Sequence, residues 1–530
     1  MRADQTPLAR SFVKGALILG IAGFIGKFLG AIYRIPLTNI VGAEGMGLYQ
    51  MVFPLYALLL TVSSSGLPAA ISRLLAEKNA LGDRRGARRV FGTAIITLAA
   101  FGAVLALLTA LLAKPIAAAQ GNPNAALAYS AISPSLFFVA VICALRGYFQ
   151  GKQNMAPTAV SQVVEQAVKM AAGLALAYYL LPRGLEWAIF GALAGVSLSE
   201  FAAMLMLIVR YFLEKNRLKP LIFSKGFGES FKTLYSLSIP VTLGALIMPA
   251  VQLIDSVMVI NILTASGSTV PAATALYGIA TGPVNSLINM PVVLSLAIAA
   301  AVIPGISAAR VKAESGKINK SAALALKLTM LISVPCAIGL AVLAAPIINL
   351  LYSGGLARGV VDEPRIAAEL LAMLSVSVLL IAFIQVITSI LQAMARSYRP
   401  VINLAIGAAV KVAASFILLP RIGIYGSAVS TILCFLTVFI LNIFSLKKTL
   451  SLKLGFRDFF FAPIAAGALM GVAAYLSNAL LSRVLHVKIA AVLAILIAGA
   501  VFFVVAWLLG AITAEEGKRI PLVKKFYKAK

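Results

Sequence analysis

Charged residues are scarce in this chain. Asp, Glu, Lys and Arg make up 12% of its 530 residues, whereas soluble domains carry roughly 25%. Hydrophobic residues make up 61%, and the mean hydropathy is +1.00. This composition excludes an ordinary soluble domain, so the sequence predicts a polytopic membrane protein.

Histidine and cysteine are almost absent. His486 is the single histidine, and Cys143, Cys336 and Cys434 lie far apart within apolar runs. This spacing fits neither a disulfide framework nor a zinc site. The sequence also lacks a Walker A motif, an HExxH motif and a grouping of Ser, His and acid. We therefore expect no metal, no cofactor and no enzymatic activity.

Long apolar runs are what the sequence has in abundance. About 20 consecutive apolar residues cross a bilayer as a helix, and we count fourteen such segments. They are centred near residues 23, 60, 101, 137, 168, 199, 246, 290, 334, 379, 410, 435, 470 and 500. Prolines at 283, 291 and 304 interrupt the eighth run, as is tolerated in helices that line a cavity.

The first ninety residues show this pattern in detail. We expect a helix over residues 12–33, a glycine-rich loop over 42–47, a second helix over 48–71 and a basic loop over 73–89.

Basic residues greatly outnumber acidic ones. The 45 Lys and Arg and 17 Asp and Glu give a net charge of +28. Basic clusters lie between apolar segments at 73–89, 210–232, 310–320, 447–457 and 518–530. The positive-inside rule places these clusters and both termini in the cytoplasm. We therefore predict a multi-pass plasma-membrane protein whose loops contact anionic lipid heads, and no nucleic-acid partner.

The second half of the sequence repeats the first in degenerate form. Gly-Leu-Tyr at 47–49 has a counterpart in Ala-Leu-Tyr at 275–277, and Leu-Leu-Pro at 180–182 recurs at 418–420. Because each half holds six helices, both halves start inside, and the repeat is parallel about an axis along the membrane normal.

The repeat predicts an all-α transporter fold with fourteen transmembrane helices. Two six-helix lobes, residues 1–230 and 231–456, would be related by a pseudo-twofold along the membrane normal. Residues 457–530 would add helices thirteen and fourteen and a basic cytoplasmic tail. In transporters built this way the substrate site lies between the lobes near the midplane.

Cations inside the predicted helices are candidate substrate-binding residues. Each costs on the order of 3 kcal/mol at mid-helix, so it normally faces a cavity or a partner. Lys27 lies midway along helix one among glycines, and we expect it to face the cavity. Arg34, nearer the outer end, either faces the cavity or snorkels to the surface. Lys411 occupies the repeat position of Lys169, and a cavity-facing role is one of its alternatives.

Carboxylates are candidates for coupling or ion pairing. Glu165 and Lys169 are spaced i, i+4 on helix five, which allows either a structural ion pair or a site. Asp255 on helix seven could pair with Lys27 or Arg34 across the lobes, or bind a coupling cation.

Further polar residues lie within the helices, among them Ser63, Ser64 and Ser65 on helix two, the repeat equivalent of helix eight. Asn285 and Asn289 on helix eight could join helices through hydrogen bonds or solvate a ligand head group. Together with Lys27 they suggest that helices one, two, seven and eight wall a polar cavity. Glu200, deep in helix six, is expected to be a protonated or hydrogen-bonded structural carboxyl.

Several of these stretches resemble a known family. Residues 26–30 (Gly-Lys-Phe-Leu-Gly), 33–34 (Tyr-Arg), 42–50, 66–72 and 81–83 are similar to the stage V sporulation protein B group. That group belongs to the polysaccharide transporter branch of the multidrug/oligosaccharidyl-lipid/polysaccharide flippase superfamily. It is related to the MurJ-type lipid II flippases. The resemblance in topology covers essentially the whole chain, and its sharp motifs lie in the first ninety residues.

The resemblance implies a function. It implies alternating access, with a polyprenyl-diphosphate-linked glycan passing from the inner to the outer leaflet of a bacterial plasma membrane. Lys27 and Arg34 would meet the diphosphate, although Arg34 stands one position beyond the MurJ pattern, where Tyr33 lies. Helices thirteen and fourteen would form a groove for the lipid tail, which suits the apolar run over 489–509. Membrane lipids and glycan-synthesis enzymes are the further partners expected.

Other readings remain open at this point. Without a nucleotide-binding motif, transport would be driven by a coupling cation (H+ or Na+), by the membrane potential or by consumption of the product. An alternative is an ion-coupled multidrug exporter of the same superfamily, with Asp255, Glu165 and Glu200 binding cationic drugs. Helices thirteen and fourteen and the intramembrane lysines argue against it. A third reading is a membrane scaffold for a glycan-synthesis complex.

Overall fold

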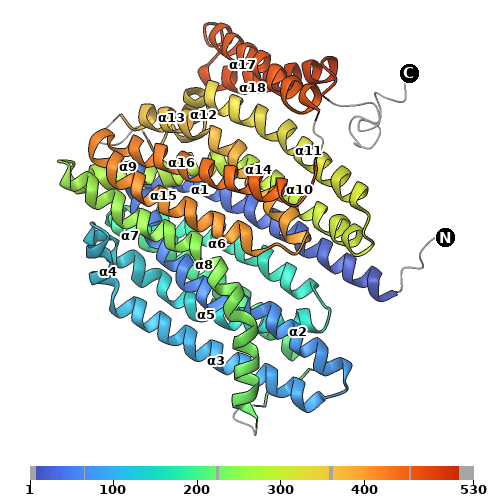
Figure 1. Cartoon of the computed structure of the whole chain (residues 1–530). Coiled ribbons are helices and arrows are strands. Elements are labelled where there is room, and N and C mark those ends of the chain that lie inside the picture. Colours follow the sequence, from blue (N-terminus) through green and yellow to red (C-terminus); the bar gives the residue numbers. More distant parts are fainter. Residues whose placement is uncertain are drawn as a thin grey trace. The chain divides into compact units, whose positions relative to one another are not determined.

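The structure is a computed structural model that describes residues 7–64, 66–215, 217–221, 226–356, 362–452 and 455–511. Within its helices, the side chains at positions 7–19, 21, 24, 27, 240, 241 and 244 lie outside this description. In the described ranges every regular element is a helix (Figure 1). Helices suit a hydrocarbon interior, where no water can satisfy the backbone N–H and C=O groups.

The chain forms two compact units. The first extends to Gly282 and takes in the segment from Gly354, and the second begins at Pro283. The helices of the first are α1 (Pro7–Ser64), α2 (Leu67–Ala80), α3 (Arg84–Leu111), α4 (Ala113–Ala119), η1 (Pro123–Ala125), α5 (Ala126–Gly151), α6 (Ala156–Leu180), η2 (Leu181–Arg183), α7 (Leu185–Phe212), α8 (Phe227–Ala265) and α9 (Val270–Ile279). After η3 (Ala280–Val284), the second holds α10 (Asn285–Val311), α11 (Ser315–Val342), α12 (Ala344–Tyr352), α13 (Glu363–Leu374), α14 (Val376–Ala393), α15 (Tyr398–Ile422), α16 (Ile424–Lys447), η4 (Phe456–Phe461), α17 (Ala462–Leu481) and α18 (Val487–Leu508). The lobe boundaries expected at residues 230 and 456 stay a prediction.

Twelve helical stretches of the described chain are long and apolar enough to cross a membrane. One of them, Phe28–Ala80, contains a kink at Gly42 and is long enough for two crossings. Helix α6 is a further candidate, because its 25 residues extend for roughly 37 Å. These segments allow the fourteen crossings that the sequence predicts, and each predicted centre lies in a helix.

Helices one and two join directly at a kink, so the loop expected over 42–47 is wrong. Only Gly42 leaves helical geometry within α1, with φ 72° and ψ −173°, a conformation that favours glycine. Gly47 remains helical and serves a close crossing, since a Cβ there would lie 2.1 Å from the Thr274 carbonyl oxygen of α9. Gly47 therefore brings α1 and α9 together instead of forming part of a flexible turn.

The basic loop expected over 73–89 is also wrong. Helix α1 ends at Ser64, before the end expected for helix two, and α2 and α3 then occupy the basic stretch. Asp83 lies in the turn between them, where it accepts a hydrogen bond from the Gly86 backbone N–H at 2.7 Å. Its other oxygen lies 3.4 Å from Lys78 Nζ. The basic side chains of this region therefore lie on two helices, of which α3 is capped by Asp83.

The prolines of the eighth run do not break it into loops. One of them lies in the π-helical turn η3, and α10 continues through Pro291 and Pro304. A membrane helix tolerates proline where local adjustments satisfy the freed backbone groups.

The two segments that carry Leu-Leu-Pro fold alike. Helices α6 and α7 form a hairpin that turns at Gly184, and α15 and α16 form one that turns at Gly423; both glycines have positive φ. In each hairpin a glycine of the second helix, Gly191 or Gly426, meets the end of the first. A Cβ there would lie 2.6 or 2.7 Å from a carbonyl oxygen. This shared local structure supports the internal repeat.

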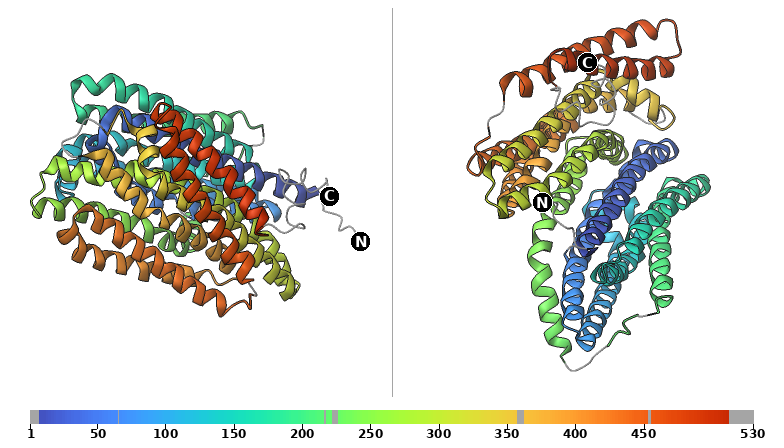
Figure 2. Two further views of the ribbon diagram at one scale, coloured as in Figure 1. Left: turned by 90° about the horizontal axis from the view of Figure 1, so that it is seen from above. Right: turned by 90° about the vertical axis from the view of Figure 1, so that its right-hand side faces the viewer.

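Helices α17 and α18 pack side by side within the second unit (Figure 2). Helix α17 also packs against α11, and α18 against α12. The pair predicted to follow the repeat is therefore anchored on the helices that precede it in the second unit.

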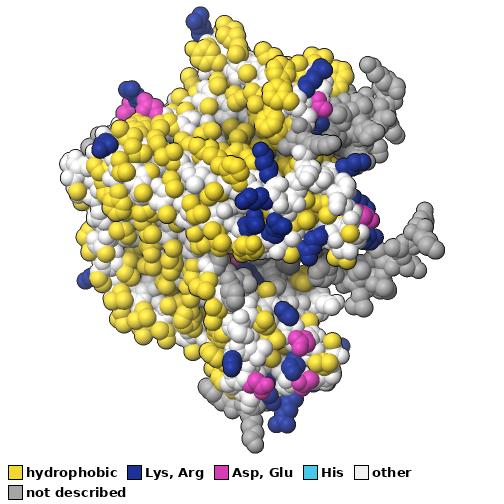
Figure 3. Space-filling view, in the orientation of Figure 1, with side chains coloured by type: hydrophobic (Ala, Val, Ile, Leu, Met, Phe, Trp, Pro, Cys, Tyr) yellow, Lys and Arg dark blue, Asp and Glu magenta, His cyan; other side chains and the backbone are white. Residues whose placement is uncertain are grey.

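The outer surface is largely apolar. Figure 3 shows hydrophobic side chains over most of the visible flank of the long helices, as contact with lipid requires. Lys and Arg gather where α2 and α3 join, at one end of the visible face.

Replacing Gly47 by alanine should destabilise the protein, because the added methyl group would overlap the Thr274 carbonyl oxygen. Overpacking of this kind costs about 1–3 kcal/mol, so we expect a lower Tm in thermal-shift measurements on the purified protein. Gly305→Ala is the matched control, since a Cβ at that position of α10 meets nothing within 4 Å. Equal melting of the two variants would contradict the close crossing.

Acidification should loosen the first turn of α3. The hydrogen bond from the Gly86 N–H, aided by Lys78, holds the pKa of Asp83 below its ordinary value. The stability that this cap contributes is therefore complete above the ordinary carboxyl pKa and is lost as pH falls through the lowered one. After correction for the intrinsic pH dependence of amide exchange, the protection of the first α3 amides should fall over that window in the wild type. In Asp83→Ala this protection should be low throughout; wild-type protection in that variant would refute the cap.

Candidate functional site

Polar side chains of α6 meet α1 in the first unit. Gln162, Glu165, Gln166 and Lys169 recur at helical spacing, so they share one side of α6. Gly30 of α1 faces them, because a Cβ there would lie 3.5 Å from Gln166 Oε1 and 3.9 Å from Lys169 Nζ. Because Gly30 has no side chain, the polar ends of Gln166 and Lys169 can lie next to the α1 backbone.

Lys27 lies in the same part of α1, but its side chain is outside the described residues. The neighbouring Gly26 also faces α6, with a Cβ position 3.6 Å from Gln166 Cγ. The α1 backbone at Lys27 therefore runs beside the polar side of α6, and the expectation that Lys27 faces a cavity stays a prediction.

Glu165 forms an ion pair with Arg146 of α5, and it also interacts electrostatically with Lys169 on its own helix. Its Oε2 lies 3.1 Å from Nη2 of Arg146, whose Nε donates to Ser161 Oγ at 3.0 Å. Gln166 Nε2 donates to the other carboxylate oxygen at 3.1 Å. The two side chains of the ion pair are 17% and 19% exposed. The ion pair of Glu165 is thus interhelical, because the Arg146 guanidinium reaches both the carboxylate and a hydroxyl. Whether Glu165 and Lys169 also form a coupling site stays a prediction.

Lys169 is directed towards α1. Its Nζ lies 5.8 Å from the centre of the Tyr33 ring, within the range of a cation–π interaction. Arg34, half-buried on α1, also interacts electrostatically with Lys169. Tyr33 itself is 2% exposed. Two cations therefore lie near each other in apolar surroundings, where an anion is attracted more strongly than in water.

An aromatic row leads from Tyr33 into the second part of α1. The ring centres are 6.4 Å apart for Tyr33 and Tyr49, 4.8 Å for Tyr49 and Phe53, and 6.0 Å for Phe53 and Tyr56. Tyr56 in turn interacts electrostatically with Glu200 of α7. The row thus separates two polar places, one at Lys169 and one at Glu200.

The remaining candidate residues lie elsewhere. Asp255 of α8 is half-buried and interacts electrostatically with Tyr277 of α9. Asn285 and Asn289 are exposed at the start of α10 in the second unit, and Asn289 Nδ2 donates to Asn285 Oδ1 at 2.7 Å. Lys411 is half-buried on α15, also in the second unit. Their membership of one cavity with α1 stays a prediction.

Reasoning from the sequence missed Arg146. It stands shortly before Lys152, so it reads as part of the basic edge that ends helix four. Its place within an apolar run, ahead of the end of α5 at Gly151, is the signal that could have revealed it.

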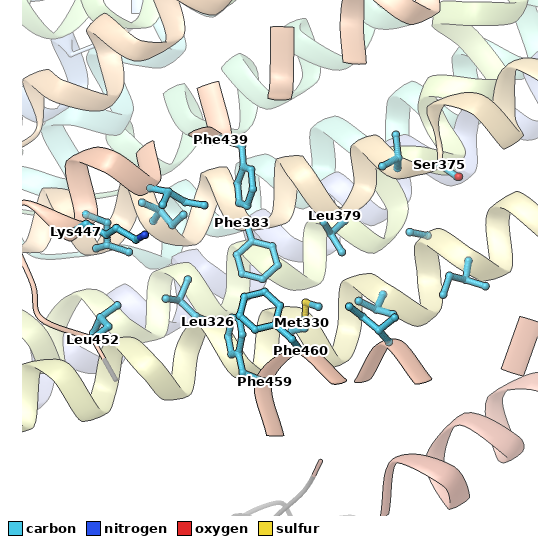
Figure 4. Close-up of a pocket in the computed structure, with 18 of the residues that line it drawn as sticks. Leu326, Met330, Ser375, Leu379, Phe383, Phe439, Lys447, Leu452, Phe459 and Phe460 are labelled. Atoms are coloured by element: carbon cyan, nitrogen blue, oxygen red, sulfur yellow. The ribbon is translucent and has the colours of Figure 1, made fainter. Parts of the chain in front are cut away.

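The second unit contains an apolar pocket of about 990 Å³ (Figure 4). Its lining comes from α11, α14, α16, η4 and the start of α17, so α18, which holds the apolar run over 489–509, is not part of it. Phe383 lies among Phe439 and Phe459, with ring centres 5.7 and 6.3 Å away. Lys447 lies at one end and is the charged member of the lining. These features suit a hydrocarbon chain with an anionic head group.

Comparison with known proteins places the chain in a family. The profile described as polysaccharide biosynthesis protein matches residues 12–310. The chain belongs to this family. This member of the polysaccharide biosynthesis family is 28% identical to stage V sporulation protein B of Bacillus subtilis (strain 168), over 97% of this chain and 98% of that protein. It is 24% identical to the lipid II flippase MurJ of the same organism, again over 97% and 98%. The predicted resemblance is confirmed.

Solved structures share the fold of this polysaccharide biosynthesis family member. The inward closed conformation of the lipid II flippase MurJ matches with a TM-score of 0.72 at 15% identity, over 93% of this chain and 99% of that one. An inward-facing multidrug resistance MATE family transporter matches with a TM-score of 0.69 at 16% identity, over 82% and 100%. The predicted all-α membrane transporter fold is therefore confirmed.

Arg146→Gln should destabilise the protein, because it leaves the Glu165 carboxylate without its counter-charge. Loss of one partner of a buried hydrogen bond costs about 1–3 kcal/mol, and more for a charged group. The double variant R146Q/E165Q should regain part of this loss, since neither charge remains. Thermal unfolding of the wild type, both single variants and the double variant gives the coupling energy. Strictly additive effects would contradict the ion pair.

Proposed function

We propose that this protein is a flippase that moves a polyprenyl-diphosphate-linked glycan from the inner to the outer leaflet of a bacterial plasma membrane by alternating access. The observation that carries the proposal is the placement of Lys169, beside the Tyr33 ring and the Gly30 backbone and within electrostatic reach of Arg34. The names of two relatives, a lipid II flippase and a sporulation protein, support it.

The sign of the charge around α6 favours an anionic cargo. Arg34, Arg146 and Lys169 are cationic, and Glu165 and Glu200 are the carboxyls that interact with them. Because Arg146 already balances Glu165, the excess is positive on the side that faces α1. A diphosphate is a multivalent anion, so a few cations in a region of low dielectric constant attract it strongly.

The cations of α1 supply the switch in this proposal. Lys27 and Arg34 bind the diphosphate while the protein is open to the cytoplasm, and Lys169 joins them from α6. Closure around uncompensated cations is disfavoured, so the loaded state closes more readily than the empty one. Lys411, Asn285 and Asn289 of the second unit are proposed to complete the site. Asp255 is the proposed place for a coupling cation, and the membrane potential is the other proposed driving force.

The lipid tail needs an apolar surface of its own. We assign it to the pocket of α11, α14, α16 and η4, with the apolar run of α18 as the groove by which it is reached. Lys447 at the end of the pocket would hold an anionic group at the membrane surface. Both termini are proposed to lie in the cytoplasm, where the basic clusters meet anionic lipid heads and glycan-synthesis enzymes.

Lys27→Ala and Lys169→Gln should each lower flipping of fluorescent lipid II in proteoliposomes by at least about tenfold, the effect of losing roughly 1.4 kcal/mol of binding to the diphosphate. Membrane abundance and Tm should stay at the wild-type values. Lys312→Ala is the matched control, because that lysine is exposed at the end of α10. Wild-type flipping by Lys27→Ala would refute the assignment of the diphosphate site.

The similarity to a multidrug resistance transporter keeps a second function in view. In that case the carboxyls Glu165, Glu200 and Asp255 would bind cationic drugs. A deletion strain distinguishes the two functions: a flippase predicts accumulation of lipid-linked precursor, and a drug exporter predicts increased drug sensitivity without such accumulation.

A further inference from the structure

Two turns that the proposed binding of the cargo does not use lie against the ends of other helices within the first unit. One follows α4 and contains Gln120 and Asn122, and the other follows α12 and contains Gly354 and Gly355. In the predicted repeat the two turns correspond, because each lies between the third and the fourth long helix of its half.

The turn after α4 is hydrogen-bonded to α8 and α9. Gln120 Nε2 donates to Ser256 Oγ at 3.1 Å, and Asn122 Nδ2 donates to Thr274 Oγ1 at 2.9 Å. Gln120 and Asn122 are each 2% exposed, and both hydroxyl-bearing residues are fully buried. Asn261 Nδ2 of α8 donates in the opposite direction, to the last carbonyl oxygen of α4 at 3.1 Å. A buried polar group that loses its partner is costly, so these bonds hold the turn against α8 and α9.

The turn after α12 meets α1 in a corresponding way. The Gly355 N–H donates to Asn39 Oδ1 at 3.1 Å. A Cβ on Gly355 would lie 2.1 Å from the Thr38 carbonyl oxygen, so this approach requires glycine. Asn39 and Asn261 are alike, since each lies near the end of the first helix of its half and donates Nδ2 to the carbonyl oxygen four residues earlier. The turn of each predicted half thus contacts the first helix of the other half.

These contacts explain where the boundary of the first unit lies. The predicted repeat assigns α8, α9 and the segment from Gly354 to the second half, because they follow residue 230. In the structure they belong to the first unit. The two halves of the sequence are therefore joined at this end of the helices. A protein that works by alternating access must part its halves on the outer side to release a cargo there.

We propose that two corresponding contacts, Asn122 with Thr274 and Asn39 with Gly355, form an outer latch that keeps the outer side closed and parts in a single movement when that side opens. The inference rests on the alternating access and the cytoplasmic termini of the proposed function, which place both contacts at the outer ends of the helices. Each hydrogen bond is made only in the closed state, so each shifts the equilibrium towards that state. Weakening either contact raises the population that is open to the outside.

A disulfide tests the contact between α1 and the turn after α12. A Cβ on Gly354 would lie 3.9 Å from the Asn39 Cβ, within the range of about 3.5–4.5 Å that a disulfide requires. In Asn39→Cys/Gly354→Cys, oxidation should lower flipping of fluorescent lipid II in proteoliposomes to the rate without protein, and reduction should reverse this loss. Each single variant is a control, and its flipping should not respond to the oxidant. Failure to cross-link, or unimpaired flipping by the cross-linked protein, would overturn the latch.

Labelling of a buried position tests whether the two contacts part together. Thr38 is fully buried beside Gly355, so a membrane-impermeant maleimide added to intact cells should label Thr38→Cys slowly. Thr274→Val removes the hydroxyl that accepts from Asn122, and it should accelerate this labelling by about tenfold, as expected for a buried donor left without its partner. Asn124→Ala is the matched control, because Asn124 is exposed in the same turn, and it should not change the rate.

Protein without Thr38→Cys gives the background from the three native cysteines. Equal labelling rates with and without Thr274→Val would mean that α8 and α9 move together with the first half, and would overturn the latch.

The possible failures are distinguishable. Flipping by the cross-linked protein would overturn the latch and leave the flippase intact. Faster labelling with Thr274→Val in a protein that does not flip lipid II would overturn the proposed cargo and leave the latch intact. If Asn39→Cys/Gly354→Cys does not fold, or is inactive when reduced, the labelling of Thr38→Cys decides alone.

Discussion

A charge within hydrocarbon is tolerated only where other groups balance it, and this constraint orders the centre of the first unit. Glu165 obtains a guanidinium from the neighbouring helix, and Lys169 obtains the face of an aromatic ring. Glu200 has neither, and depends on charges that it shares. Because these groups come from α1, α5, α6 and α7, the four helices must meet at one place for any of the charges to be stable.

Close contact between backbones is the second condition. Within a bilayer, helices associate through packing of small residues, because lipid tails are as apolar as leucine. Gly30 lets the polar side chains of α6 reach the α1 backbone. Gly173 and Gly195 bring α6 and α7 so close that a Cβ on Gly195 would lie 2.3 Å from the Gly173 Cα. Gly47 does the same for α1 and α9. The arrangement of the polar side chains therefore depends on glycines, which have no side chain and so allow the helix backbones to approach closely.

Hydropathy along the sequence was enough to predict the membrane class and the positions of the apolar helices, because it is a local property. The fourteen crossings and the two repeated lobes stay predictions. The loop predicted over 42–47 was wrong because its structure depends on a contact that is distant in the sequence. Glycine reads as a turn unless one knows that Thr274, far away in the sequence, lies against Gly47. Likewise, the spacing of Glu165 and Lys169 shows which residues of α6 can interact with each other, but not which residues of other helices lie near them. The competing partner, Arg146, became visible only when α5 and α6 were packed together.

The kink at Gly42 has a mechanical consequence. The arm of α1 before it contains about 35 residues and extends for roughly 50 Å, so a rotation of only about 10° at this one joint moves its far end by about 9 Å. Rotation at a single glycine thus moves the end of the arm by a distance comparable to the width of a helix, whereas Tyr33, about 13 Å from Gly42, moves by only about a quarter as much against Tyr49. The displacement is largest at the N-terminal end of α1, and it is smallest near Gly42, where the Tyr33 and Tyr49 rings are in contact.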